Sequence, residues 1–295
     1  MSKKILSLGS DFKLEKAEYA IEYIDTLVKY TCNESGILPQ MTFKTRTIDD
    51  MIINEKNNHD GTYTTTIKTN VADENNLPTS IKFTGENSLL SVDELKHTKC
   101  LTNCSHMFNE CTNLSYINTM NFDTLNVTDM IYMFTGCQSL TTLDVSNFNT
   151  SNVTSMRSMF QSCKLLTSLD LSNWDTNNVT DMGSMFQSCK LLTSLDLSNF
   201  DTTNVTTMNS MFYECNQLTS LVLSNFNTTN VTRMGYMFNN CYNLTSLELS
   251  TNFIINTSTD IANMFTDSAL IQSGINYNGA PQATQDIINS MVPAA

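Results

Sequence analysis

The chain has 295 residues and a formal net charge of −13, and only 15% of its residues are charged, so Asn, Ser and Thr supply much of its polarity. This charge disfavours nucleic acid as a partner, because phosphates require Lys and Arg, and it leaves basic, neutral and glycan partners open. No run approaches the roughly 18 apolar residues of a membrane span, and no signal peptide or anchor pattern is visible. We therefore expect no membrane insertion and a protein that is cytosolic, exported by an unannounced route, or released by lysis.

Residues 1–96 are predicted to form an N-terminal α+β region. Residues 12–31 space their apolar side chains as a helix does, with charge on the other face, and 88–96 is predicted to be a second helix. Alternating or Thr-rich segments predict strands at 41–43, 62–69 and 80–83, with a turn at 57–61. We expect this region to shield the first repeat, or to dock the chain on a larger assembly.

A repeat array follows. Residues 158–173 (SMFQSCKLLTSLDLSN) recur unchanged at 184–199. Six cysteines keep the same interval of 26 residues: Cys111, Cys137, Cys163, Cys189, Cys215 and Cys241. Fixed periods of this size are typical of stacked repeat proteins.

Each repeat has two halves with different periods. In residues 166–171 the last two leucines, Leu169 and Leu171, are separated by one residue, which is the alternation of a short strand. The apolar residues of 179–189 occupy one face of a short helix at about 100° per residue. The pattern predicts an α/β solenoid over 97–271, with about six 26-residue units of a short parallel strand plus a short helix. Residues 272–295 are predicted to be a C-terminal cap with a helix at 284–291.

The motif M-F-x-x-C-x-x-L followed by L-x-L resembles the BspA-like leucine-rich repeat proteins. The resemblance covers about residues 101–271. These are bacterial and protist surface proteins, with relatives in phage. The resemblance implies a right-handed leucine-rich repeat solenoid and adhesion to a ligand on a host or cell surface.

One outward row of the predicted strands is acidic. The residue between the two strand leucines should point away from the core, and in four units it is Asp144, Asp170, Asp196 or Glu248. Hydroxyl residues flank this row: Thr142, Ser168, Ser194 and Ser220. Like charges about 5 Å apart repel, which favours a basic partner or a cation. The alternative is a solubilising surface without a ligand.

A second polar row exchanges acid for amide, which is typical of turns or helix caps. It consists of Asp123, Asn149, Asp175, Asp201 and Asn227. Five N-V-T triplets recur with the repeat, and we expect their asparagines to be unmodified and to satisfy backbone groups.

Catalytic chemistry finds little support, because no nucleophile elbow, phosphate loop or H-E-x-x-H motif occurs. The cysteine ladder lacks the close spacing of zinc sites, so core packing is favoured over metal or redox chemistry. The only local cluster combines Cys100 and Cys104 with His97 and His106. We expect no catalytic residue, no cofactor and no metal site.

These observations predict a non-enzymatic binding protein whose strand face contacts a protein or glycan on a host or cell surface. One alternative is a phage structural or attachment protein, with residues 1–96 docked on the virion. Another is a cytosolic scaffold that recognises a protein of the same cell.

Overall fold

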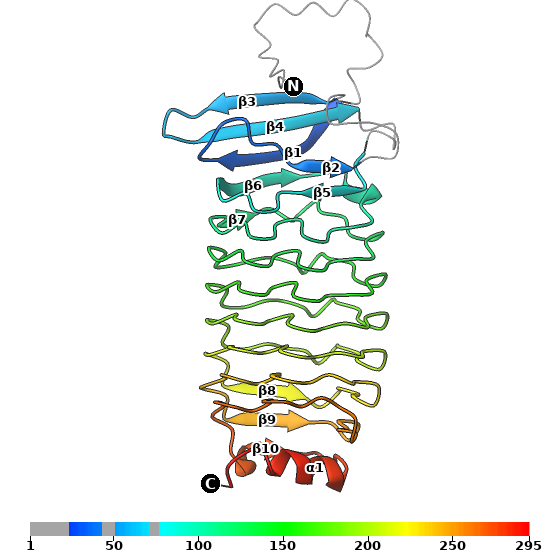
Figure 1. The fold of residues 1–295 in the computed structure, drawn as a ribbon. Coiled ribbons are helices and arrows are strands. Elements are labelled where there is room, and N and C mark those ends of the chain that lie inside the picture. The colour runs from blue at the N-terminus through cyan, green and yellow to red at the C-terminus, as the bar shows by residue number, and fades with distance from the viewer. Residues whose placement is uncertain (1–23, 43–50, 71–76, 295) are drawn as a thin grey trace, which may run out of the picture.

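The computed structural model describes residues 24–42, 51–70 and 77–294. The described part is a column, with small sheets at the N-terminal end and the helix α1 (Gln282–Asn289) at the other end (Figure 1). Between them the chain runs in stacked coils, one for each 26-residue unit. Single parallel β-bridges join residues one unit apart, as from Ser155 to Asp181 and from Asp181 to Thr207.

The N-terminal end contains two sheets. The larger has the strand order β3-β4-β1-β6-β7, in which β7 runs parallel to β6 and the other pairs are antiparallel. Its strands are β1 (Ile24–Cys32), β3 (Ile52–Asn57), β4 (Tyr63–Asn70), β6 (Leu89–Leu95) and β7 (Tyr116–Ile117). The smaller sheet pairs β2 (Gln40–Thr42) with β5 (Ser80–Lys82).

Both helices predicted for the N-terminal region are wrong where the structure describes them. The segment 24–31 belongs to strand β1, and 88–96 contains strand β6; residues 12–23 lie outside the described residues. The strands predicted at 62–69 and 80–83 are confirmed as β4 and β5, and β2 covers the first two residues of 41–43. The turn predicted at 57–61 joins β3 to β4, where Asn57 pairs with Tyr63.

The sequence of strand β6 predicts a helix because its buried residues have a helical spacing. Leu89, Val92 and Leu95 are buried, and the residues between them are half-buried. The register of β1 against β6 shifts twice, between Lys29 and Tyr30 and between Thr31 and Cys32. Each irregularity changes which side chains face the core, so the usual alternation becomes an interval of three.

The predicted α/β solenoid is also wrong, because its units contain no α-helix. Among the described residues α1 is the only α-helix, and it follows the last unit. After β7 in the first coil, the next regular strands of the described chain come in the last coils, as the parallel sheet of β8 (Ser220–Leu223), β9 (Ser246–Leu249) and β10 (Ile275–Asn276). Sheets dominate the described regular structure instead.

The segment predicted to be helical is a succession of turns. In residues 179–189 the backbone N–H groups of Met182, Ser184 and Phe186 donate to carbonyl groups of the next coil. Ser184 and Ser188 have φ values of 57° and 58°. A helix requires negative φ and a carbonyl acceptor four residues earlier, so these residues cannot continue one.

The interior agrees with the sequence pattern. The repeated Val, Met, Phe, Cys and first Leu side chains are buried, and the phenylalanines of successive coils stack. The rings of Phe134 and Phe160 lie 5.8 Å apart at 3°, and those of Phe160 and Phe186 lie 5.9 Å apart at 9°. Phe83 continues this stack into the N-terminal region, 5.8 Å from Phe108.

The two ends of the stack are covered differently. β6 pairs with β7, so the N-terminal sheet continues directly into the first coil. At the other end the helix predicted at 284–291 is confirmed as α1, whose Ile288 is buried and whose Thr284 accepts a hydrogen bond from the N–H of Ile255 at 3.1 Å. The domain boundaries at 96/97 and 271/272 stay predictions.

Candidate functional site

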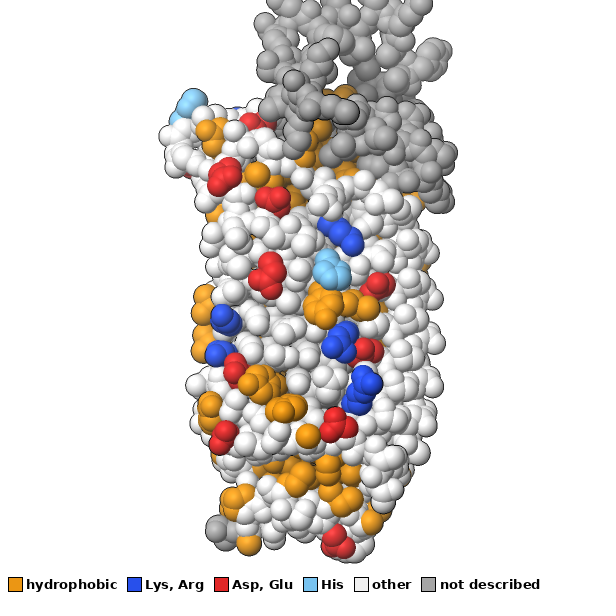
Figure 2. Space-filling view, in the orientation of Figure 1, with side chains coloured by type: hydrophobic (Ala, Val, Ile, Leu, Met, Phe, Trp, Pro, Cys, Tyr) orange, Lys and Arg blue, Asp and Glu red, His pale blue; other side chains and the backbone are white. Residues whose placement is uncertain are grey.

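The surface of the stack has few cations. Residues 101–295 include fourteen acidic side chains but only four basic ones, Arg157, Lys164, Lys190 and Arg233. Figure 2 shows one face, on which basic and acidic side chains lie near one another within a mainly neutral surface. Arg157 pairs with Asp181 at 3.5 Å, Lys190 pairs with Glu214 at 3.2 Å, and the Lys164 ammonium donates to Gln138.

We call the surface formed by the leucine strand segments and their counterparts the strand face. Within 166–171 the backbone buries Leu166 and Leu171 and leaves Thr167, Ser168 and Asp170 exposed. The same exposure holds for the predicted positions Thr142, Asp144, Ser194, Asp196 and Ser220. Glu248 is half-buried, and it pairs in register with the exposed Val222.

The aspartates of the strand face are held by their own coils. One carboxylate oxygen of Asp170 accepts hydrogen bonds from the Ser172 hydroxyl at 2.7 Å and from the Ser172 N–H at 3.0 Å. Ser146 donates to Asp144 in the same way, and the N–H of Ser198 donates to Asp196.

These hydrogen bonds keep the aspartates ionised. The Ser146 hydroxyl and N–H lower the pKa of Asp144, and the neighbouring Asp170 charge opposes them more weakly. The pKa of Asp170 and that of Asp196 are lowered by the equivalent serines. The result is a row of fixed negative charges, one for each of three successive coils.

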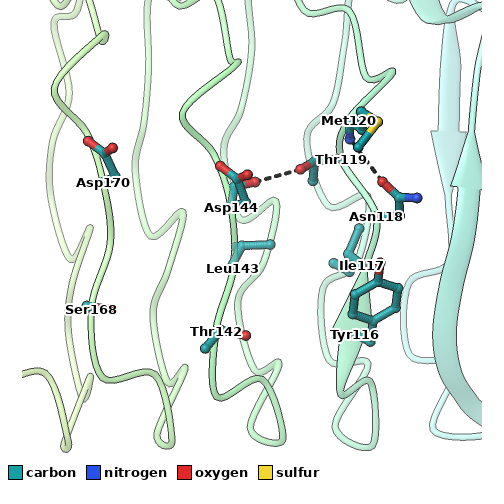
Figure 3. Close-up of a pocket in the computed structure, with 10 residues that line it drawn as sticks. All are labelled: Tyr116, Ile117, Asn118, Thr119, Met120, Thr142, Leu143, Asp144, Ser168 and Asp170. Carbon is teal, nitrogen blue, oxygen red and sulfur yellow. Dashed lines mark hydrogen bonds between the residues drawn. The ribbon is translucent and has the colours of Figure 1, made fainter.

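A hollow of about 500 Å³ opens at the N-terminal end of the strand face (Figure 3). It spans three coils, and the predicted residues that line it are Thr142, Asp144, Ser168 and Asp170. Tyr116 and Met120 line it as well, with side chains that are 53% and 80% exposed. Sequence reasoning missed these two, although both break the repeat, where later coils have Thr or Ser.

A smaller hollow of about 280 Å³ lies further along the strand face. It combines the predicted residues Ser194, Asp196 and Ser220 with the exposed Val222. The structure therefore divides the predicted surface into two hollows, and Glu248 belongs to neither.

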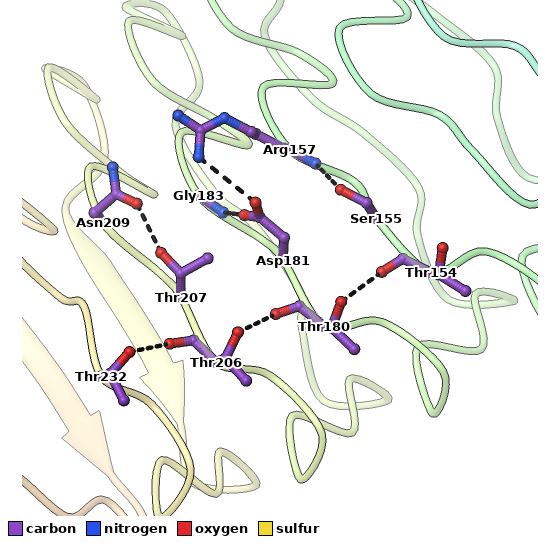
Figure 4. Close-up of polar contacts among 10 residues, drawn as sticks. All are labelled: Thr154, Ser155, Arg157, Thr180, Asp181, Gly183, Thr206, Thr207, Asn209 and Thr232. Atoms are coloured by element: carbon purple, nitrogen blue, oxygen red, sulfur yellow. Dashed lines mark hydrogen bonds and ion pairs between the residues drawn. The ribbon is translucent and has the colours of Figure 1, made fainter.

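The turn segments form a different surface, along the single β-bridges (Figure 4). Each hydroxyl of an exposed threonine row donates to the carbonyl group of the preceding threonine of that row; for Thr180 the acceptor is the carbonyl of Thr154 at 3.2 Å. Asp181 accepts the N–H of Gly183 at 2.8 Å and pairs with Arg157. These polar groups satisfy one another, so this surface offers fewer free groups than the strand face.

The cysteine ladder has a structural role. All nine cysteines are free thiols, and the six of the repeat are buried. Each of these six donates its Sγ–H to a phenylalanine carbonyl group. The acceptor of Cys111 is Phe83 in the N-terminal region, and the other five reach the preceding coil, as Cys163 reaches Phe134 at 3.2 Å. Within the described ranges, no three His, Cys, Asp or Glu side chains are grouped so that they could hold a metal ion.

The second polar row acts within turns, as predicted. One carboxylate oxygen of Asp175 accepts the N–H of Asn177, and that of Asp201 accepts the N–H of Thr203. The asparagines of the N-V-T triplets each donate to a carbonyl group of the preceding coil, as from Asn178 to Ser151 at 2.7 Å.

None of the helices in the described part of the chain is long and apolar enough to cross a bilayer.

Comparison with known proteins identifies the repeats and leaves their role open. The model of a family described as "Mycoplasma protein of unknown function, DUF285" matches residues 102–196 and 191–289. The two matched stretches together cover more than half of the chain. No curated protein and no solved structure matches the chain.

Proposed function

Since the chain belongs to the DUF285 family of Mycoplasma proteins of unknown function, we propose from its surface that it is a non-enzymatic binding protein whose strand face contacts a protein or glycan. The observation that carries this proposal is the row of exposed carboxylates of Asp144, Asp170 and Asp196, beside which no cation of the described chain lines either hollow. Fixed like charges in adjacent coils repel, and a ligand with donors or positive charge would relieve that repulsion.

The type of ligand is proposed from the repeat motif. Its resemblance to BspA-like surface proteins supports a ligand on a host or cell surface. Exposed hydroxyl groups beside the carboxylates, such as those of Ser168 and Ser194, add hydrogen-bonding capacity suited to a protein or a sugar.

The test removes charge without changing shape. Asp144→Asn, Asp170→Asn and Asp196→Asn are combined in one variant, because an asparagine oxygen can still accept the serine N–H. The wild type and this variant are then compared for binding to an immobilised panel of glycans and of basic, neutral and acidic peptides. We expect at least one class to bind the wild type and to bind the variant about tenfold or more weakly, which corresponds to about 1.4 kcal/mol.

A matched control carries Asp123→Asn, Asp175→Asn and Asp201→Asn, which change the net charge equally in the turn row. We expect this control to bind as the wild type does. An equal loss of binding in both variants would show that overall charge causes the loss. Unchanged binding in the strand-face variant would contradict the proposal.

The two other settings stay predictions, namely a virion attachment protein docked through residues 1–96 and a cytosolic scaffold. Fractionation of the native source separates them, because the protein would then be found in purified particles or in the cytosol instead of at the cell surface.

A further inference from the structure

The hollow at the N-terminal end of the strand face has walls that the repeat does not explain. Later coils have Thr or Ser at the position of Tyr116, and Ser at the position of Met120. Both side chains are more than half exposed, so they contribute little to the core. Exposed aromatic and thioether groups of this kind are typical of contact surfaces.

The next two coils supply the negative charge. Figure 3 shows Asp144 and Asp170 on successive coils beside the one that carries Tyr116 and Met120. One oxygen of each carboxylate is held by a serine, and the other makes no hydrogen bond to any residue that the structure describes. Asp144 and Asp170 hold the same position in successive coils and line the same hollow, so a single cationic group in the hollow can contact both carboxylates. Among the residues with a described position, no Lys or Arg lines the hollow.

We propose that this hollow binds an arginine side chain of a protein partner. The guanidinium group bridges Asp144 and Asp170, its plane lies against Tyr116, and its aliphatic stem contacts Met120. Arginine fits better than lysine, because its planar fork donates in two directions and stacks on aromatic rings. This inference rests on the proposed use of the strand face and names the partner group at one end of it.

The test uses the full chain and a defined probe. A peptide Ac-Gly-Gly-Arg-Gly-Gly-NH2 is titrated into isotopically labelled protein and followed by NMR, beside a twin in which citrulline replaces arginine. Citrulline keeps the shape and loses the charge. We expect the arginine peptide to shift resonances of residues around the hollow, and the citrulline peptide to bind about tenfold more weakly, as a lost charge-assisted contact implies.

Variants locate the site on the protein. Asp170→Asn should weaken binding of the arginine peptide about fivefold. Tyr116→Thr restores the residue type of the later coils, and it should remove most of the preference for arginine over lysine. Both positions are exposed, so the fold should persist, which unchanged circular dichroism would verify. Asp201→Asn, with the same charge change in the turn row, serves as the matched control and should leave binding unaltered.

Equal binding of the arginine and citrulline peptides would overturn the inference, as would resonance shifts confined to another surface. Its failure can be told apart from failure of the proposed function. If the arginine peptide does not bind but the triple asparagine variant still loses a ligand of the panel, the strand face remains a binding surface and only the arginine hollow is refuted.

Discussion

The repeat cysteines show at the residue scale how one side chain serves packing and hydrogen bonding together. Cys189 is buried, and its thiol donates to the Phe160 carbonyl at 3.1 Å, which pairs a backbone oxygen inside the core. Burial raises the pKa of the Cys189 thiol to about 12. Because the thiolate is the reactive form, such a thiol is protected by both its burial and its protonation.

One cysteine should therefore react with thiol reagents faster than the other eight. Cys100 is half-buried, and the other eight cysteines are buried. We expect a disulfide reagent such as DTNB at pH 8 to modify one thiol rapidly in the native protein and the other eight only after denaturant is added. Cys100→Ala should abolish the rapid phase, whereas two or more rapid thiols in the wild type would contradict the burial of the ladder.

At the element scale, the turn segments depend on residues with positive φ. Each unit has two of them in the turn segment that donates hydrogen bonds to the next coil. In one unit they are Ser158 and Ser162, with φ of 55° and 60°. The preceding coil has Gly136 where the next one has Ser162. A left-handed conformation costs a residue with a Cβ atom about 1–2 kcal/mol relative to the right-handed one, so the turns bear a conformational cost that the hydrogen bonds between coils offset.

Substitution of Ser162 tests this geometry. Ser162→Val should lower the unfolding free energy by about 1–2 kcal/mol, because a β-branched residue is strained at positive φ. Ser162→Gly should be neutral or slightly stabilising, since glycine adopts this conformation freely. Urea unfolding followed by circular dichroism measures both. Thr167→Val at an exposed position of the strand face is the control, and a loss as large as that of Ser162→Val would contradict the argument.

At the scale of the whole molecule, the buried thiols act together. Burial raises the pKa of Cys111, Cys189 and Cys241 to about 12, and it raises that of Cys137, Cys163 and Cys215 well above the ordinary value near 9. A group whose pKa is raised in the folded state contributes stability that is fully present below the unfolded pKa. That stability is lost as pH rises toward the folded pKa.

The fold should therefore be stable at neutral pH and weaken steeply between about pH 9 and pH 12. Each buried thiol contributes up to about 1.4 kcal/mol per pH unit in that range, because the unfolded chain releases a proton that the folded chain retains. Urea midpoints measured from pH 7 to pH 11 would record the decline. The double variant Cys163→Ala, Cys189→Ala should show a shallower decline, whereas a flat profile in the wild type would contradict the prediction.

By itself, the sequence determined the period of 26 residues, the interior side chains and the outward rows. The apolar spacing correctly predicts the core residues of one turn segment although it predicts the wrong backbone; these residues are Val179, Met182, Met185, Phe186 and Cys189. The reason is that apolar spacing reports which side chains are buried, and both a helix and a succession of turns can bury residues three and four apart.

Only the tertiary structure decided which groups the backbone N–H groups donate to and which side chains come into contact. The N–H of Ser184 donates to the Asn209 carbonyl on the next coil, a partner that no local pattern reveals. Shifts of register in β6 concealed a strand for the same reason. The hollow that brings Tyr116 beside Asp144 likewise depends on the register between coils, because residues 26 positions apart become neighbours only when the coils stack.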